Sequence, residues 1–238
     1  MSNFDDSLWA DTEFSKSFRE DADIFLPLRR QFIEAAKSIY GHFINPDTEA
    51  GILDLGCGDG LFIQELLKSF SPENITLVDG SSEMLAAARK RLHYAANIDF
   101  LQIDFQKLLS EQPLTKHFDF IYSSLAIHHL SYSEKCKLYT YIYRLLKAGG
   151  CFVHYDVVLF SSEKNEAWYM EHWRNWIDNY PDRKRSKNLL GIPDDYKQNR
   201  DNLPDTLESQ LHALKEIGFK DVDCYFKHGI FSLFGGLK

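Results

Sequence analysis

The sequence predicts an α/β protein in which helices cover both faces of a doubly wound, mainly parallel sheet. Three observations lead to this prediction. Short apolar runs alternate with amphipathic segments between residues 51 and 158. The first of these runs leads directly into a glycine-rich loop. The last two runs, 219–226 and 230–237, are too close together for a parallel return, so we expect them to pair antiparallel.

The expected strands are short and each is followed by a turn or a helical pattern. They cover residues 51–55, 74–79, 98–103, 118–124, 151–158, 219–226 and 230–237. The expected helices among them cover residues 61–70, 81–92, 133–146 and 206–217. Ser81 and Ser82 are placed to cap the second helix, and Gly149 is placed to end the third.

Two segments lie outside this alternation. Residues 1–47 are expected to form an N-terminal arm, acidic as far as residue 23, followed by a helix that begins near Pro27. Residues 161–205 are polar and aromatic, and we interpret them as a helical lid inserted into the domain. The remaining segments, 48–160 and 206–238, then form the core of a single domain.

Composition limits the classes of function. The chain has 238 residues, of which 27 are basic and 35 acidic, for a formal charge of -8. This balance argues against binding along a nucleic acid, which needs a dense basic face, and favours a small-molecule partner. The absence of a long apolar run or a signal-peptide pattern predicts a cytoplasmic protein with no membrane segment. The four cysteines are too scattered for a disulfide framework, and no metal site is expected.

The most specific motif is Asp54-Leu-Gly-Cys-Gly-Asp-Gly60, which directly follows the first expected strand. Its glycines allow a sharp turn and a close approach of a ligand to the main chain. The spacing G-x-G-x-G differs from the G-x-G-x-x-G of dinucleotide-binding loops. Asp54 would repel a pyrophosphate, but it can accept hydrogen bonds from an ammonium group. The loop therefore favours a zwitterionic ligand.

Two further acidic residues follow neighbouring strands. Asp79 lies at the carboxyl end of the second strand, where a carboxylate can accept hydrogen bonds from both hydroxyls of a ribose. Its alternative role is that of a turn or cap residue. Asp104 and Phe105 follow the third strand, and there an acceptor beside an aromatic ring can hold an adenine amino group. A plain helix cap is the alternative at Asp104.

These motifs, together with the segments 118–130 and 145–150, resemble those of class I S-adenosylmethionine-dependent methyltransferases over roughly residues 48–160. The resemblance implies a Rossmann-like sheet of order 3-2-1-4-5-7-6 with the last strand antiparallel, and S-adenosylmethionine as cofactor. It implies cofactor contacts from Arg29, Asp54, Gly56, Cys57, Gly58, Gly60, Asp79, Gly80, Met84, Asp104, Phe105, Ser123 and Ser124. A looser similarity of residues 206–219 and 227–238 is to the subgroup that contains carboxy-S-adenosylmethionine synthase and uncharacterised relatives.

Methyl transfer from a sulfonium is an in-line displacement that mainly requires alignment and exclusion of water. A general base helps if the acceptor is a hydroxyl or a protonated amine. The candidates near the ends of the fourth and fifth strands are His128, His129, His154, Tyr155 and Asp156. His128 and Asp156 are the two we select; loop structure and turn formation are their alternatives. The insertion contains four neighbouring aromatic residues, Trp168, Tyr169, Trp173 and Trp176. They either cover a planar acceptor or pack on the domain.

The leading hypothesis is therefore a methyltransferase that uses S-adenosylmethionine and a small-molecule acceptor, as a monomer or homodimer. A nicotinamide-dependent oxidoreductase is the alternative from another enzyme class; the glycine spacing and the terminal antiparallel pair argue against it. A non-catalytic S-adenosylmethionine-binding module is a third hypothesis. Within the family, an enzyme of modified-cofactor chemistry or of tRNA modification also stays open.

Overall fold

The computed structural model describes residues 4, 7–44 and 50–238. Its strands form one seven-stranded sheet of order β3-β2-β1-β4-β5-β7-β6, as the resemblance implied. The strands are β1 (Gly51–Leu55), β2 (Asn74–Asp79), β3 (Ile98–Gln102), β4 (Phe118–Ser124), β5 (Leu146–Val157), β6 (Lys220–His228) and β7 (Phe231–Leu237). The boundary expected at residues 47 and 48 lies outside the described residues.

The first five strands are parallel, and β7 runs antiparallel to both of its neighbours. β1 pairs with β2 on one side and with β4 on the other, so the direction of chain progression reverses between β1 and β4. In such open sheets, ligands bind beyond the carboxyl ends of the strands at this point of reversal. The topology alone therefore directs attention to the end of β1.

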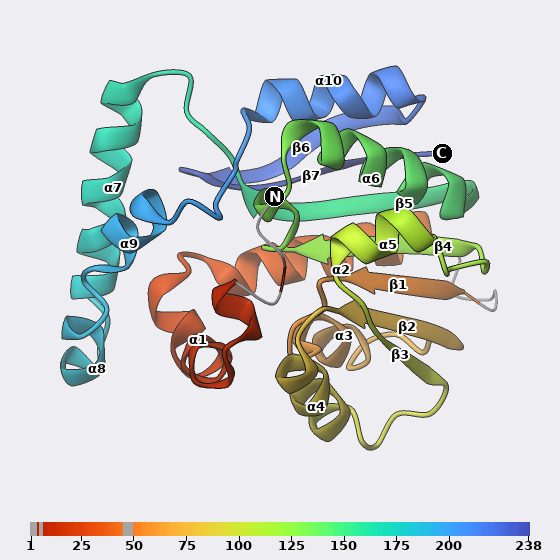
Figure 1. Cartoon of the computed structure of the whole chain (residues 1–238), viewed down its shortest axis with the longest axis horizontal. Coiled ribbons are helices and arrows are strands. Elements are labelled where there is room, and N and C mark those ends of the chain that lie inside the picture. Colours follow the sequence, from red (N-terminus) through yellow and green to blue (C-terminus); the bar gives the residue numbers. More distant parts are fainter. Residues whose placement is uncertain (1–3, 5–6, 45–49) are drawn as a thin grey trace.

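Helices cover both faces of the sheet, and three more stand at one end (Figure 1). The helices are α1 (Thr12–Phe25), α2 (Arg29–Phe43), α3 (Leu61–Leu66), α4 (Ser82–Arg91), α5 (Phe105–Glu111), α6 (Tyr132–Leu145), α7 (Glu163–Asp178), α8 (Arg183–Lys187), α9 (Ile192–Gln198) and α10 (Leu207–Ile217). Short 3-10 turns are η2 (Leu8–Ala10) and η3 (Ile127–His129). α2, α3 and α4 cover one face, and α5, α6 and α10 cover the other.

Neighbouring strand residues serve opposite faces, which divides the core into two clusters. Tyr122 and Val153 pack on the side of α2 and α3. Ile121 and Phe152, each one position earlier in its strand, pack on the side of α6 and α10. This alternation, a property of every strand, decides which polar residues near the strand ends reach a given cavity.

The junction between α6 and β5 differs from the expectation. The helix ends at Leu145 and the strand begins at once at Leu146, so Gly149 lies within β5 and does not end the helix. The N–H of Gly149 donates to the carbonyl of Lys238 at 2.9 Å, and its φ of 78° lies at an irregularity in the pairing of β5 with β4. Pairing with Lys238, directly after β7, thus overrides the helix-ending preference of glycine.

The insertion forms α7, α8 and α9, and it supports the N-terminal arm. α7 stands beside the end of the sheet (Figure 1) and contacts α1. The Nε1–H of Trp173 donates to the carbonyl of Phe25 at 2.5 Å. Arg185 of α8 forms an ion pair with Asp21 of α1. The insertion and the arm therefore form one contiguous layer at this end of the molecule.

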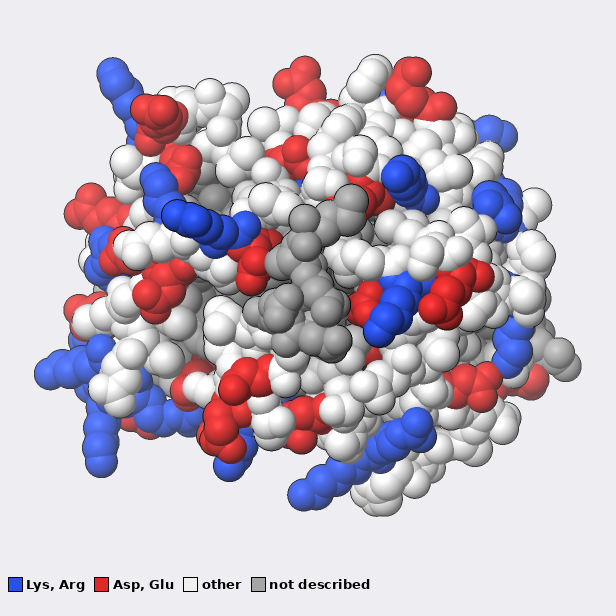
Figure 2. Space-filling view, viewed as in Figure 1, with Lys and Arg blue, Asp and Glu red and all other residues white. Residues whose placement is uncertain are grey.

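Charged side chains of both signs are mixed over the viewed face, with basic ones gathered near α8 at the lower left (Figure 2). Two arginines of α8 have acidic partners: Arg183 lies 3.6 Å from Asp178, and Arg185 pairs with Asp21. Much of this local positive charge is therefore balanced. None of the described helices is long and apolar enough to cross a membrane.

Candidate functional site

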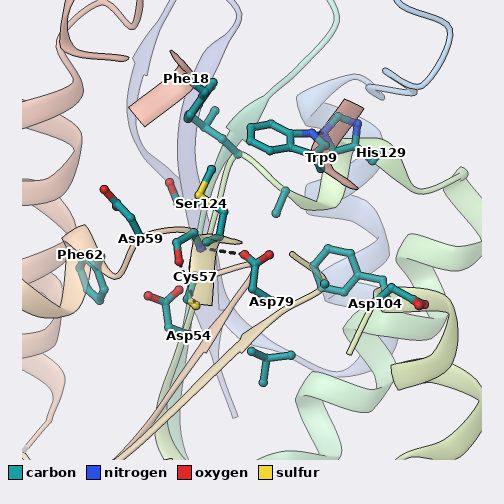
Figure 3. A pocket seen from close by; sticks show the side chains of 18 of the residues that line it. Trp9, Phe18, Asp54, Cys57, Asp59, Phe62, Asp79, Asp104, Ser124 and His129 are labelled. Atoms are coloured by element: carbon teal, nitrogen blue, oxygen red, sulfur yellow. Dashed lines mark hydrogen bonds between the residues drawn. The ribbon is translucent and has the colours of Figure 1, made fainter. Parts of the chain in front are cut away.

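A cavity lies beyond the carboxyl ends of β1, β2 and β4, where the topology directs attention (Figure 3). The glycine loop after β1 forms one wall, and the residues that follow β2, β3 and β4 form others. The N-terminal arm closes the cavity from outside, chiefly through Trp9, Phe18 and Arg19. The site therefore combines the sheet core with a segment more than 30 residues earlier in the chain.

The glycine loop requires the left-handed backbone conformation at three positions. Gly56, Gly58 and Gly60 have φ values of 67°, 53° and 74°. A Cβ atom at Gly56 would lie 2.4 Å from the Cβ of Ala126, so packing as well as φ requires glycine there. A Cβ atom at Gly58 would meet nothing within 4 Å. Gly58 therefore presents open main chain to the cavity, where a ligand can approach it.

Asp79 connects the glycine loop to the end of β2. Its Oδ2 accepts a hydrogen bond from the N–H of Gly58, and its Oδ1 accepts one from the N–H of Ser81, both at 2.8 Å. Burial raises the pKa of Asp79 to about 6, although these two hydrogen bonds lower it. Each carboxylate oxygen keeps acceptor capacity toward the cavity. Asp79 can therefore hold the loop and still bind the hydroxyls of a ligand.

Asp54 is the most unusual group in the site. Its side chain is 1 % exposed, and neither oxygen has a hydrogen-bond partner among the described residues. Burial, and then the negative charges of Asp79 and Asp59, raise the pKa of Asp54 well above its usual value. A buried carboxyl group without partners is costly. The arrangement is suited to a ligand that brings a cation or several donors to Asp54.

Two tyrosine hydroxyls extend this unpartnered polar region. Tyr122 lies directly opposite Asp54 in the pairing of β4 with β1, and Tyr155 follows on β5 beside Ser124. Both hydroxyls are buried without a partner in the described part of the chain, and both residues line the cavity. Sequence reasoning did not select them for the cofactor, although strand alternation puts them on the same face as Asp54.

Arg29 also lines the cavity, from the start of α2. Its side chain is 17 % exposed, and its Nη1 donates to Oδ1 of Asp23 at 2.9 Å. The guanidinium group has five N–H donors, so this ion pair leaves donors for a ligand. Arg29 is thus a cationic group in the same cavity as the buried carboxyl group of Asp54.

Asp104 takes the alternative role that the sequence left open. Its Oδ1 accepts a hydrogen bond from the N–H of Lys107 at 2.8 Å and so caps α5, while the residue still lines the cavity. The ring of Phe105 lies 3.5 Å from the position that a Cβ of Gly56 would take. These two residues border the cavity on the side of Asp79, as Figure 3 shows for Asp104.

Some of the other expected cofactor contacts line the cavity and others do not. Cys57, Gly80, Met84 and Ser124 line the cavity. Gly60 and Ser123 do not. Gly60 faces Ala88 and Leu92. Ser123 is fully buried, and its hydroxyl donates to the carbonyl of Leu55 at 2.7 Å. Ser123 lies away from the cavity because consecutive strand residues face opposite sides of the sheet. Phe4 of the arm covers Gly80, and its ring comes within 2.7 Å of the position that a Cβ of Gly80 would take.

Asp156 and His128, the expected catalytic residues, do not line the cavity. Asp156 is 1 % exposed and accepts hydrogen bonds from the main-chain N–H of His128 and from Nε2 of His154, both at 2.9 Å. Its other oxygen lies 2.5 Å from Nδ1 of His128. Burial alone raises the pKa of Asp156, but the charges and hydrogen bonds of His128 and His154 lower it below its usual value. This buried network holds the turn η3.

His129, next to the expected residue, is the histidine that lines the cavity. Its Nδ1 lies 3.0 Å from the carbonyl oxygen of Asp201, and its Nε2 accepts a hydrogen bond from Nε1–H of Trp9 at 2.8 Å. Burial, and then the neighbouring His128, lower the pKa of His129 to about 3. Figure 3 shows the Trp9 and His129 rings side by side. The sequence did not reveal which member of the histidine pair the turn would direct inward.

The aromatic residues of the insertion are not part of the cavity wall. Tyr169 and Trp173 are buried, and Trp168 is 60 % exposed; neither these residues nor Trp176 line the cavity. Trp173 joins α7 to the arm through the carbonyl of Phe25, and the ring of Tyr169 packs against Gly229. The insertion reaches the cavity through Asp201. In the part of the chain that the structure describes, no group of three or more His, Cys, Asp or Glu residues is arranged to bind a metal ion.

Comparisons with known proteins agree with this fold. The family described as "Methyltransferase domain" matches residues 52–150. Malonyl-[acyl-carrier protein] O-methyltransferase 2 of Ilyobacter polytropus is 28% identical over 178 residues, which are 74% of this chain and 63% of that protein. A protein of the same kind from Halalkalibacterium halodurans is 38% identical over 84 residues, 35% of this chain and 31% of the other. The chain thus spans less than two thirds of the length of these relatives.

A second kind of relative matches at lower identity but over more of its length. The carboxy-S-adenosyl-L-methionine synthase of Nautilia profundicola is 23% identical over 235 residues, which are 96% of this chain and 93% of that protein. The solved structure of magnesium protoporphyrin IX methyltransferase from Synechocystis, with SAH bound, has a TM-score of 0.65 at 11% identity, with 97% and 96% of the two chains covered. An O-methyltransferase family protein from Burkholderia thailandensis has a TM-score of 0.67 at 14% identity, covering 98% and 62%. Both share the fold described above.

Proposed function

We propose that this chain, which carries a methyltransferase domain and belongs with the S-adenosylmethionine-dependent methyltransferases in sequence and fold, transfers a methyl group from that cofactor to a small-molecule acceptor. The observation that carries the proposal is the buried carboxyl group of Asp54, which has no hydrogen-bond partner among the described residues, beside the open main chain of Gly58. A cofactor with an ammonium group completes the hydrogen bonding of Asp54, whereas a pyrophosphate would be repelled by it.

The residues present fit the parts of this cofactor. Asp54 would bind the ammonium group, and Arg29, with donors to spare beyond Asp23, would bind the carboxylate of the methionine portion. Asp79 would accept hydrogen bonds from the ribose hydroxyls. Phe105 would lie against the adenine, with Asp104 at its edge. The hydroxyls of Tyr122 and Tyr155, and Ser124 at the end of β4, would complete the polar contacts of the methionine portion.

When bound, the cofactor would supply a sulfonium methyl group for in-line transfer to a lone pair of the acceptor, with the thioether sulfur as leaving group. The chain's part is to align the two molecules and to exclude water. The glycine loop and Asp79 hold one partner in a fixed place. Trp9 and Phe18 of the arm line the cavity, where their rings would help to exclude water.

A small acceptor suits both the enclosure and the charge of the chain. The arm closes over the cavity, and its α1 is held down by the ion pair of Arg19 with Glu83 and by Trp173 of α7. A large polyanion would meet a chain of formal charge -8, in which two of the basic residues of α8, Arg183 and Arg185, already pair with carboxylates. The buried free thiols Cys57 and Cys151 suit a reducing compartment, which supports a cytoplasmic location.

Equilibrium titrations test the cofactor assignment. We expect the chain to bind S-adenosylhomocysteine and not NADH, and we expect Asp54→Asn to weaken that binding because the amide cannot pair with an ammonium group as a carboxylate does. Tight binding of NADH alone would overturn the proposal in favour of an oxidoreductase. A screen of acceptor classes for S-adenosylhomocysteine production follows; lasting inactivity despite good cofactor binding would favour a binding module.

Carboxy-S-adenosylmethionine synthesis is the second candidate, because relatives with that name match nearly the whole chain. Such a product carries an extra carboxylate near the sulfonium, and a cation is needed to hold it. Among the described residues, the arginines that line the cavity are Arg19, which pairs with Glu83, and Arg29, which is assigned above to the carboxylate of the methionine portion. This favours the methyltransferase. Mass spectrometry of the cofactor that copurifies with the chain distinguishes the two, since the synthase product is heavier by one carboxyl group.

A further inference from the structure

Building on the proposed function, we propose that Nε2 of His129 binds the hydrogen-bond donor of the methyl acceptor, and that the Trp9 indole N–H occupies this place while the arm is closed. The acceptor class that follows is a planar aromatic molecule with an O–H or N–H group on its edge. His129 is then a specificity-determining residue of the acceptor site.

The first observation is the hydrogen bonding of His129. The carbonyl oxygen of Asp201 can only accept, so Nδ1 of His129 must carry the proton in their 3.0 Å contact. The indole Nε1–H of Trp9 can only donate, so Nε2 must offer a lone pair in their 2.8 Å contact. Two independent partners thus specify one neutral tautomer. The low pKa of His129, caused by burial and by His128, agrees with that neutral state.

The second observation is the setting of Trp9. Its ring meets Phe14, Phe18 and His129 edge to face, with centroid distances of 5.2, 4.9 and 6.0 Å. Trp9 and Phe18 line the same cavity as the glycine loop. The cavity therefore already holds a flat aromatic ring with an N–H donor on its edge. An acceptor of similar shape and chemistry can make the same contacts.

The third observation is that the place of Trp9 can be vacated locally. Trp9 belongs to the three-residue turn η2, which buries none of its residues. The following helix α1 is anchored separately by the ion pair of Arg19 with Glu83 and by the bond from Trp173 to Phe25. The turn can therefore move while α1 stays in place, and His129 then offers Nε2 to an incoming molecule.

The position of His129 also fits an acceptor site. It lies in η3, just after Ser124, Leu125 and Ala126, and Ala126 packs against Gly56 of the cofactor loop. The buried carboxylate of Asp156 holds this turn through the main-chain N–H of His128. His129 is thus fixed beside the proposed cofactor site, on the side that the arm covers.

The main test uses the whole chain saturated with S-adenosylhomocysteine. Calorimetric titration compares 2-naphthol with 2-methoxynaphthalene, which has the same ring system without the O–H. We expect 2-naphthol to bind roughly five- to tenfold more tightly, as one neutral hydrogen bond allows. In His129→Asn the amide N–H still reaches the carbonyl of Asp201 but the Nε2 acceptor is gone, so this preference should vanish. His212→Asn, at an exposed histidine of α10, should leave the preference intact.

Equal affinities in the unaltered chain, a preference that survives His129→Asn, or no binding of either ring compound would overturn the inference. A failure to bind S-adenosylhomocysteine would instead count against the proposed function. Trp9→Phe gives a second measurement, since it keeps a ring for Phe14 and Phe18 but removes the competing N–H. It should bind 2-naphthol more tightly than the unaltered chain and 2-methoxynaphthalene about equally, and a weaker binding of 2-naphthol would contradict the displacement of Trp9.

Discussion

Asp79→Asn should weaken cofactor binding while making the empty chain more stable, because two opposing properties meet in this carboxylate. Burial raises the pKa of Asp79 from 3.8 to about 6. A carboxyl group whose pKa is raised in the folded chain favours the folded state only while it is protonated. Its contribution to the free energy of unfolding is therefore lost as the pH rises from about 4 through about 6. At about 1.4 kcal/mol per pKa unit, the ionised group costs the empty chain roughly 3 kcal/mol at pH 7.

The amide removes that cost but also removes a hydrogen bond. Asparagine has one acceptor oxygen, so it can accept from the N–H of Gly58 or of Ser81 but not from both, a loss of about 1 to 2 kcal/mol. The empty variant should therefore be about 1 to 2 kcal/mol more stable. Toward the cofactor it loses a charge-assisted acceptor for the ribose, and the affinity for S-adenosylhomocysteine should fall by roughly 1.5 to 3 kcal/mol, about 10- to 150-fold.

Urea denaturation of the empty chain at pH 7 and calorimetric titration with S-adenosylhomocysteine measure the two effects. Asp99→Asn is the matched control, because Asp99 is an exposed strand residue paired with Lys116, and its exchange should change neither quantity appreciably. Unchanged affinity in Asp79→Asn would mean that the ribose site is misplaced. A variant that is less stable than the unaltered chain would refute the reasoning from the raised pKa.

Three further substitutions test other parts of the structure. Gly58→Ala should lower the affinity for S-adenosylhomocysteine in a calorimetric titration, since its Cβ would project into the cavity. Gly149→Ala is the control, because Gly149 also has a positive φ and open space around it. Each variant should lose about 1 kcal/mol of stability, but Gly149→Ala should leave the affinity unchanged. Asp156→Asn should destabilise the chain by about 3 kcal/mol in urea denaturation at neutral pH. Because the folded pKa of Asp156 is lowered, this difference in stability should shrink as the pH falls below about 4. A difference that does not change with pH would contradict an ionised Asp156 in the buried network. Trp173→Phe should free the arm by removing the bond to Phe25, seen as faster amide hydrogen exchange in α1, and unchanged exchange would show that other contacts hold it.

The sheet and the glycine loop could be predicted because their signals are local. Apolar runs, turn residues and the loop Asp54–Gly60 place strand ends without knowledge of distant contacts, and the resemblance supplied the strand order. The start of β5 could not be predicted in this way. Lys147–Gly150 has the composition of a helix end, and only its pairing with the chain near Lys238 makes it a strand.

The residues observed to line the cavity differ from the expected ones for one main reason, the alternation of faces along a strand. Asp156 was expected to face the cleft, but it shares a face with His154 and packs toward α6, while Tyr155 between them faces the cavity. The sequence already implied this orientation, since Phe152 and Asp156 are an even number of residues apart and therefore lie on the same face of the strand. The contact of Trp9 with His129 was not available, because it joins residues 120 positions apart through loops whose paths no local pattern determines.

The place of β7 within the sheet affects the order in which the chain can assemble during synthesis. β7 lies between β5 and β6, so β6 has no partner in the sheet until β7 has been made. About 70 residues separate the end of β5 from the start of β7, which at 5 to 20 residues per second is a delay of roughly 4 to 15 s. Over that interval the outer edge of β5 is open to other chains. A chain truncated before β7 would keep that edge exposed. Conditions that stall synthesis within the last third of the chain should therefore cause aggregation as well as loss of activity.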